Sequence, residues 1–133
     1  MSRRISKHFN ESEFECKHCG QVIIAQALVY ALEAVREHFN APVTINSGFR
    51  CMYHNMAVGG ALSSYHMRGM AADIQVKGAT PQEVYQFCDT LSVKGGVGLY
   101  KSFVHIDVRP YTARWIDKMV LKEWEDGLNG THT

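Results

Sequence analysis

A chain of 133 residues, 46% of them hydrophobic, is long enough to fill one core and too short for two independent domains. Its formal net charge of +1 gives no overall attraction to nucleic acid or to an anionic membrane, which argues against both as partners. No apolar run approaches the length of a membrane span. The basic opening MSRRISKHFN is not followed by the apolar stretch that a secretory signal needs. The sequence therefore predicts a protein that is cytoplasmic as synthesised, without membrane insertion.

The first 20 residues are predicted to form an irregular arm, which contains the turn-like sequence CKHCG. An amphipathic helix is predicted from Ile24 to Phe39, because its apolar residues recur at steps of three and four. Asn40 and Pro42 end this helix. A short strand, residues 43–46, then leads into a long loop, residues 47–65, which has no lasting periodicity. A loop of this length in a small domain is usually functional or disordered.

A second strand and a second helix are predicted after this loop. The strand runs from Ala71 to Val76. The helix has a strong start signal, since Thr80 is a cap, Pro81 is the first helical residue and Glu83 completes a capping box. Its buried side is predicted to consist of Val84, Phe87, Cys88 and Leu91.

The last part of the chain predicts two strands and a helix. The strands, residues 96–100 and 103–108, are close enough to form a hairpin. A C-terminal extension, residues 113–133, begins with a helix that Gly127 ends and finishes in a frayed tail. The elements together predict an α+β fold in which helices pack on one face of a small, mostly antiparallel sheet.

Three residues that are distant in the sequence are candidates for one metal site: His66, Asp73 and His105. Two imidazoles and one carboxylate suit a catalytic zinc, because a fourth position stays open for water or substrate. On a strand, residues two apart share a face, so His105 and Asp107 are expected to point the same way. Each residue alone has a plainer interpretation, as a surface histidine or as an aspartate that caps a turn.

The segments SGFR, N-x-x-VGGA-x-x-S-x-H-x-x-G-x-AAD and FVHIDVR resemble the zinc D-Ala-D-Ala carboxypeptidase family. These peptidoglycan peptidases share a metal-binding core with the Hedgehog signalling domain. The resemblance covers residues 9–115. Within the family, the chain is similar to small single-domain members found in phages and prophages. It implies one zinc peptidase domain, residues 1–133, with a Hedgehog-like fold and a catalytic zinc held by His66, Asp73 and His105.

The same resemblance implies roles for residues beside the metal. Arg50, in SGFR, would meet the substrate's carboxylate or stabilise the developing oxyanion, and an arginine fork suits both tasks. A solvated loop cation is the alternative. Ser64 could add a hydrogen bond at the site, or could simply be a turn residue.

The general base is not carried over by the resemblance. Relatives place a Glu three residues before the last ligand or a His two before it, and here Ser102 and Phe103 stand at those positions. Asp107 is the nearest substitute, either as the base or as a group that orients the last zinc ligand. His54 and Tyr100 are further candidates.

A second set of metal-binding residues combines a C-x2-C sequence with a C-x2-H sequence. The four residues, Cys16, Cys19, Cys51 and His54, would form a complete tetrahedral structural zinc site. Such a site would tie the arm to the loop just after Arg50. Free thiols and a disulfide are the alternatives, and His54 cannot be both a ligand and the base.

These observations predict a zinc metallopeptidase that hydrolyses peptidoglycan stem peptides, with a D-Ala-D-Ala carboxypeptidase as the first choice of activity. An endopeptidase of the endolysin type is one alternative. A zinc-binding structural module without activity, for instance in a phage particle, is another. The protein is predicted to be a monomer that reaches the cell wall if it is released or carried by a phage. Nucleic acid binding through CKHCG is disfavoured by the near-neutral charge.

Overall fold

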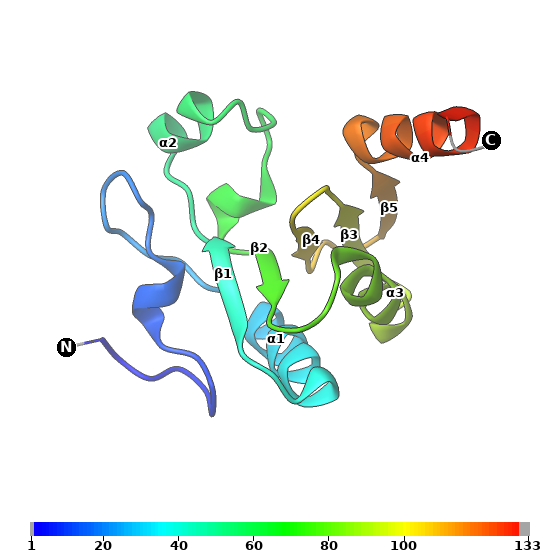
Figure 1. Cartoon of the computed structure of the whole chain (residues 1–133). Helices are drawn as coiled ribbons and strands as arrows, with labels where there is room; N and C mark the ends of the chain where they lie inside the picture. Colours follow the sequence, from blue (N-terminus) through cyan, green and yellow to red (C-terminus); the bar gives the residue numbers. More distant parts are fainter. Residues whose placement is uncertain (1, 131–133) are drawn as a thin grey trace.

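The computed structural model describes residues 2–130, with side chains as far as Gly127. In this part of the chain five strands form one mixed sheet in the order β1-β2-β4-β3-β5 (Figure 1). The strands are β1 (Val43–Ser47), β2 (Ala71–Val76), β3 (Gly95–Leu99), β4 (Val104–Asp107) and β5 (Thr112–Ile116). All neighbours pair antiparallel except β3 and β5, which are parallel. The predicted α+β fold with a mostly antiparallel sheet is confirmed.

Two helices, α1 (Gln26–Phe39) and α3 (Pro81–Leu91), pack on one face of the sheet (Figure 1). Helix α1 ends as predicted at Asn40, which adopts a left-handed conformation with φ of 48°. Thr80 and Glu83 form the predicted capping box of α3. The core between these helices and the sheet is tightly closed, since its central side chains are at most 1% exposed: Leu32, Ile74, Val84 and Val104.

The long loop after β1 holds two short helical segments, α2 (Met52–Ala57) and a 3-10 helix, η2 (Tyr65–Arg68). In Figure 1, α2 lies beyond the C-terminal end of β1, and η2, which contacts both α2 and β2, leads into the start of β2. This agrees with the prediction of a loop that carries at most short helical turns. The loop is therefore ordered over the face on which the candidate site residues lie.

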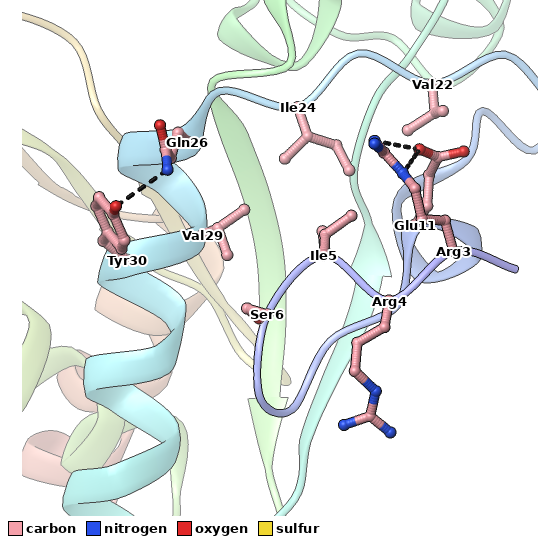
Figure 2. Close-up of a pocket in the computed structure, with 10 residues that line it drawn as sticks. All are labelled: Arg3, Arg4, Ile5, Ser6, Glu11, Val22, Ile24, Gln26, Val29 and Tyr30. Atoms are coloured by element: carbon pink, nitrogen blue, oxygen red, sulfur yellow. Dashed lines mark hydrogen bonds and ion pairs between the residues drawn. The ribbon is translucent and has the colours of Figure 1, made fainter.

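The N-terminal arm packs along β1 (Figure 1) and contains a 3-10 helix, η1 (Glu11–Phe14). Phe9 and Phe14 anchor the arm in the core, with exposed fractions of 2% and 1%. A cavity of about 480 Å³ lies between the arm and the start of α1. Figure 2 shows its apolar lining from Ile5, Val22, Ile24 and Val29 beside the ion pair of Arg3 and Glu11. No described residue lines both this cavity and the cleft over the candidate metal site.

The predicted C-terminal helix from Ala113 is wrong in its first part, because residues 112–116 form β5 and the helix α4 begins only at Lys118 (Lys118–Gly130). The side chains of this segment alternate as in a strand. Trp115 covers Gly98 of β3 on one face of the sheet, and Arg114 points to the opposite face, toward α3. Gly98 allows this contact, since a Cβ there would overlap the indole ring.

Gly127 does not end α4 as predicted, but lies within the helix. The predicted frayed tail extends into residues 131–133, which lie outside the described part of the chain. Among the described residues, none of the helices has the length and apolarity needed to cross a bilayer.

Candidate metal centre

One row of paired residues crosses the sheet on the face opposite α1 and α3. Asp73 on β2 pairs with His105 on β4, and His105 pairs with Gly98 on β3. The row continues to Ser47 at one end and to Trp115 at the other. Directly opposed residues on neighbouring strands have adjacent side chains. The strand register therefore places a carboxylate beside an imidazole at the middle of the sheet.

His66 reaches the same point from η2 rather than from the sheet. Ser64 caps this segment, since its Oγ accepts a hydrogen bond of 3.2 Å from the His66 N–H. Gly69 ends the segment with φ of 69°, and its lack of a side chain allows the Ile23 carbonyl to approach. The short helix buries His66 to 2% exposure over Asp73.

The donor atoms of the three residues converge. His66 Nε2 lies 3.2 Å and His105 Nδ1 lies 3.0 Å from the same oxygen, Asp73 Oδ1. All three candidate donor atoms are within 4.8 Å of one another. A single ion can therefore contact all three residues.

The second nitrogen of each histidine is already hydrogen-bonded. His66 Nδ1 donates to the Gly48 carbonyl over 2.8 Å, and His105 Nε2 donates to the Asp107 carboxylate over 2.8 Å. In its neutral form each ring therefore presents a lone pair at the nitrogen next to Asp73 Oδ1. Three electron-pair donors that face one another need a cation or a proton between them. Such support of the remote nitrogen is typical of zinc-binding histidines, so the donor set fits a metal ion.

The pKa values of Asp73 and His105 also show that this group of side chains stabilises a positive charge beside the Asp73 carboxylate. Burial would raise the pKa of the Asp73 carboxyl, but hydrogen bonds with His105 and His66 hold it well below its ordinary value. Burial would lower the pKa of His105, but Asp107 and Asp73 raise it. Asp73 is therefore a carboxylate at neutral pH, available as a ligand.

Arg50 lies beside this group, and each of its three guanidinium nitrogens has a hydrogen-bond partner. Its Nη2 donates to Asp73 Oδ2 over 3.1 Å, while Nε donates to Ser47 Oγ over 3.0 Å. Nη1 lies 3.4 Å from Oδ1 of Asn55, a side chain that is 2% exposed and also donates to the Ala61 carbonyl. Arg50 is thus fixed at the cleft wall and is not a solvated loop cation.

A cleft of about 570 Å³ opens above Asp73. Arg50 and residues of the α2–η2 loop form one wall. Tyr100, Phe103, Trp115 and Arg109 also line the cleft. In the described part of the chain, Asp73 is the one carboxylate that lines this cleft.

These observations coincide with a family match, since residues 6–107 match the peptidase M15 family. The chain belongs to the peptidase M15 family. Over 53 residues it is also 47% identical to the zinc D-Ala-D-Ala carboxypeptidase of Streptomyces albus G, a stretch that covers 38% of this chain and 21% of that relative. The chain therefore matches well under two thirds of the relative's length. The predicted cofactor, zinc, agrees with the family, with the relative's name and with the two donor groups.

In this M15 peptidase Asp107 does not reach the cleft, although it was a candidate for the general base. Its side chain is 0% exposed. Besides His105 it accepts hydrogen bonds from the Gly96 N–H (2.8 Å) and from the Arg109 guanidinium (2.6 Å to Nη2). Burial opposes ionisation of Asp107, but its hydrogen bonds with His105 and Arg109 hold its pKa well below its ordinary value. Asp107 is a hydrogen-bonded carboxylate behind His105.

The other candidates for the base are placed differently. His54 does not line the cleft, whereas Tyr100 does. The Tyr100 hydroxyl accepts a hydrogen bond of 3.0 Å from Trp115 Nε1 and its ring stacks on Phe103. Tyr100 is therefore a wall residue with a fixed hydroxyl.

Arg109 is a cleft residue that sequence reasoning missed. Its guanidinium lies 4.6 Å from the ring centre of Tyr65 and 5.3 Å from that of Trp115, and it is paired with Asp107. The D-x-R spacing in FVHIDVR could have indicated Arg109. Nothing in the sequence indicated the aromatic partners, because they come from η2 and β5.

The second predicted set is brought together in part. The sulfurs of Cys16, Cys19 and Cys51 form a group within 4.8 Å, and neither His54 nor His18 is among its members. Of these two histidines, His18 has a ring nitrogen near the group, since its Nδ1 lies 3.6 Å from Cys51 Sγ. Burial opposes ionisation of Cys16, but backbone N–H groups that point at its sulfur lower the pKa to about 6. Cys88 belongs to the core as predicted, and burial raises its pKa to about 12.

Proposed function

We propose that this domain is a zinc peptidase of peptidoglycan stem peptides and that it removes a terminal D-alanine. His66, Asp73 and His105 hold the catalytic zinc in this proposal. The observation that carries it is the convergence of three lone-pair donors at the floor of a cleft, with the remote nitrogen of each histidine already engaged. The family match and the named relative support the same chemistry.

Bound zinc supplies a water of lowered pKa and polarises the scissile carbonyl. The chain's own residues prepare the site for that chemistry. Asp107 keeps the His105 proton on Nε2, so that Nδ1 faces the metal position. Asp107 is accordingly a positioning residue in this proposal and not the base, because its carboxylate is sealed from the cleft.

Arg50 has two tasks in this proposal. It neutralises Asp73 Oδ2, which leaves Oδ1 directed at the metal position. It also presents a guanidinium at the cleft wall, where a substrate carboxylate or a developing oxyanion would lie. A second guanidinium, that of Arg109, lines the same cleft. Together with the exposed Arg68, three arginines line this cleft, which favours a substrate with a free terminal carboxylate over an internal peptide bond.

A zinc-binding module without activity is a second candidate, and one observation favours it. Among the described residues that line the cleft, Asp73 is the one carboxylate, and in this proposal it is a zinc ligand. No second carboxylate in the cleft is left to act as a general base. The site would then bind a peptide end, for instance on the wall or in a phage particle, without cutting it.

The test uses purified, zinc-loaded protein and two muropeptides, one ending in D-Ala-D-Ala and one cross-linked. We expect release of D-alanine from the first, detected by mass spectrometry, its loss on chelation and its return with zinc. Cleavage of the cross-linked substrate alone would assign an endopeptidase. Absence of any cleavage by a protein shown to hold zinc at His66, Asp73 and His105 would favour the inactive module.

A further inference from the structure

The CKHCG segment folds into a tight turn that closes on itself. The Gly20 N–H donates to the Cys16 carbonyl over 2.8 Å, and the Cys16 N–H donates to the Gln21 carbonyl over 2.7 Å. Gly20 completes the turn with φ of 75°, a conformation that favours glycine. The turn places Cys16 inside the protein and Cys19 at its surface.

Cys51 meets this turn from the loop that follows β1. Its backbone N–H donates to Cys16 Sγ over 3.4 Å, and its own Sγ accepts from the His54 N–H over 3.4 Å. Backbone N–H groups of His18 and Cys19 also point at Cys16 Sγ. Sulfur atoms surrounded by N–H donors are stabilised as thiolates.

We propose that this domain binds a second, structural zinc ion through Cys16, Cys19, Cys51 and His18. Zinc–sulfur bonds of about 2.3 Å in a tetrahedron separate the sulfurs by about 3.8 Å, a spacing within the 4.8 Å that spans this group. His18 supplies the fourth donor, because its Nδ1 lies 3.6 Å from Cys51 Sγ. His54, the fourth ligand predicted from the sequence, faces Cys51 with its backbone N–H.

A disulfide explains this arrangement less well. All four cysteines of the chain are free thiols in the structure. A disulfide would use two of the three clustered sulfurs and leave the third beside them with no partner of its own. It would also gain nothing from the N–H donors, which favour negative charge on sulfur. A metal ion uses every sulfur of the group.

The zinc would connect the arm to the residues that shape the catalytic site. Next to Cys51, the Arg50 N–H donates to the His66 carbonyl over 3.1 Å, and the Phe49 N–H donates to the Phe14 carbonyl over 2.9 Å. The arm touches Gly48 so closely that a Cβ there would lie 2.8 Å from Phe14 Cα. The carbonyl of that same Gly48 holds His66. The second zinc thus steadies Arg50 and the support of His66 from behind.

The test measures metal content and does not depend on activity. In the Asp73→Ala background, which lacks a ligand of the first site, we expect one zinc per chain. Cys51→Ser in that background should leave none, while Cys88→Ala, which removes a cysteine outside the group, should leave one. Retention of the zinc in Cys51→Ser, or its absence from Asp73→Ala, would overturn the proposal.

Cobalt substitution tests the same site without a cysteine variant, in case those variants fold poorly. Thiolate ligands give an intense near-ultraviolet charge-transfer band with Co²⁺, which the first site, lacking sulfur, cannot give. We expect this band in the wild-type protein, and we expect it to change in His18→Ala but not in His54→Ala. The reverse result would reassign the fourth ligand to His54 and refute the choice of His18. A wild-type spectrum without the band would refute the thiolate site while leaving the peptidase proposal intact.

Discussion

The two groups of metal-binding side chains differ in how the fold holds them. His105 and Asp73 lie on adjacent strands in the centre of the sheet, and His66 is buried above them. The cysteine group joins a turn of the arm to the start of α2, and its members range from buried to exposed. The first group opens into a cleft that is lined by cations and aromatic rings. The second brings three sulfurs together, with the His18 ring beside one of them.

This difference explains why the two groups suit different tasks. A catalytic metal needs rigid ligands and an open coordination position, and a sheet with a hydrogen-bonded carboxylate behind it provides both. A structural metal needs complete coordination, and its ligands can come from segments that have little structure without it. The outcomes expected below separate the two groups, from the largest effect to the smallest.

Replacing Asp73 should separate the groups most clearly. Asp73→Ala removes the central ligand of the sheet group, so we expect hydrolysis to fall on the order of 10³-fold or more. The matched control is Asp89→Ala, which removes a half-exposed carboxylate on α3 and should keep its activity. The measurement is the initial rate of D-alanine release. Unchanged hydrolysis by Asp73→Ala would contradict the assignment of the catalytic site.

Arg50 lies between the two groups, and its conservative replacement tests its geometry. Arg50→Lys keeps the charge but loses the planar contacts to Ser47, Asn55 and Asp73. We expect kcat/KM to fall on the order of 10²-fold with unchanged zinc content. Arg4→Lys, an exposed arginine of the arm, is the control. Full activity of Arg50→Lys would show that only its charge matters.

Replacing Asp107 tests whether its hydrogen bond to His105 contributes to metal binding by His66, Asp73 and His105. In Asp107→Asn the partner of His105 Nε2 loses its charge, so we expect zinc affinity to fall about 10- to 100-fold. Excess zinc should then restore much of the activity. A zinc competition titration, with the rate measured at saturating zinc, provides the readout. If Asp107 were the base, the rate would stay low even in the fully loaded variant.

Glu33 tests how firmly the arm is held without any metal. Its carboxylate on α1 accepts hydrogen bonds from Ser6 Oγ (2.5 Å) and from the His8 ring (2.6 Å). Burial would raise the pKa of Glu33, but these bonds lower it below its ordinary value of 4.5. A lowered pKa means that the unfolded chain binds more protons, so this stabilisation is present above pH 4.5 and is lost as the pH falls below it.

Glu33→Gln should therefore reduce the free energy of unfolding by about 1 kcal/mol at pH 7. The difference from wild type should shrink as denaturation is repeated at pH values below 4.5, the ordinary pKa of this group. Glu37→Gln, an exposed position on the same helix, should match wild type at every pH. A Glu33→Gln deficit that is independent of pH would point to packing and not to charge.

Local patterns in the sequence predicted most of the fold. The apolar spacing of α1, the capping box of α3 and the alternation of β4 each identify an element without knowledge of the rest. The strand β5 was missed, because the spacing of Ile116, Val120 and Trp124 imitates a helix. Only its pairing with β3, which no local pattern contains, shows that the segment is extended.

The candidate site was predictable in its residue types and not in its arrangement. Two-residue alternation places His105 and Asp107 on one face, but it does not show that Arg109 closes over Asp107 and seals it from the cleft. The position of His18 beside Cys51 was also not predictable from the sequence. It depends on how the CKHCG turn of the arm meets the start of α2, and the spacing C-x2-H does not determine that contact.

The most direct test of the central claim is an anomalous difference map, recorded at the zinc absorption edge from crystals of the zinc-loaded protein. We expect a peak bonded to His66 Nε2, Asp73 Oδ1 and His105 Nδ1, with His105 Nε2 still hydrogen-bonded to Asp107. A map in which zinc binds elsewhere, with no peak among these three side chains, would contradict the account.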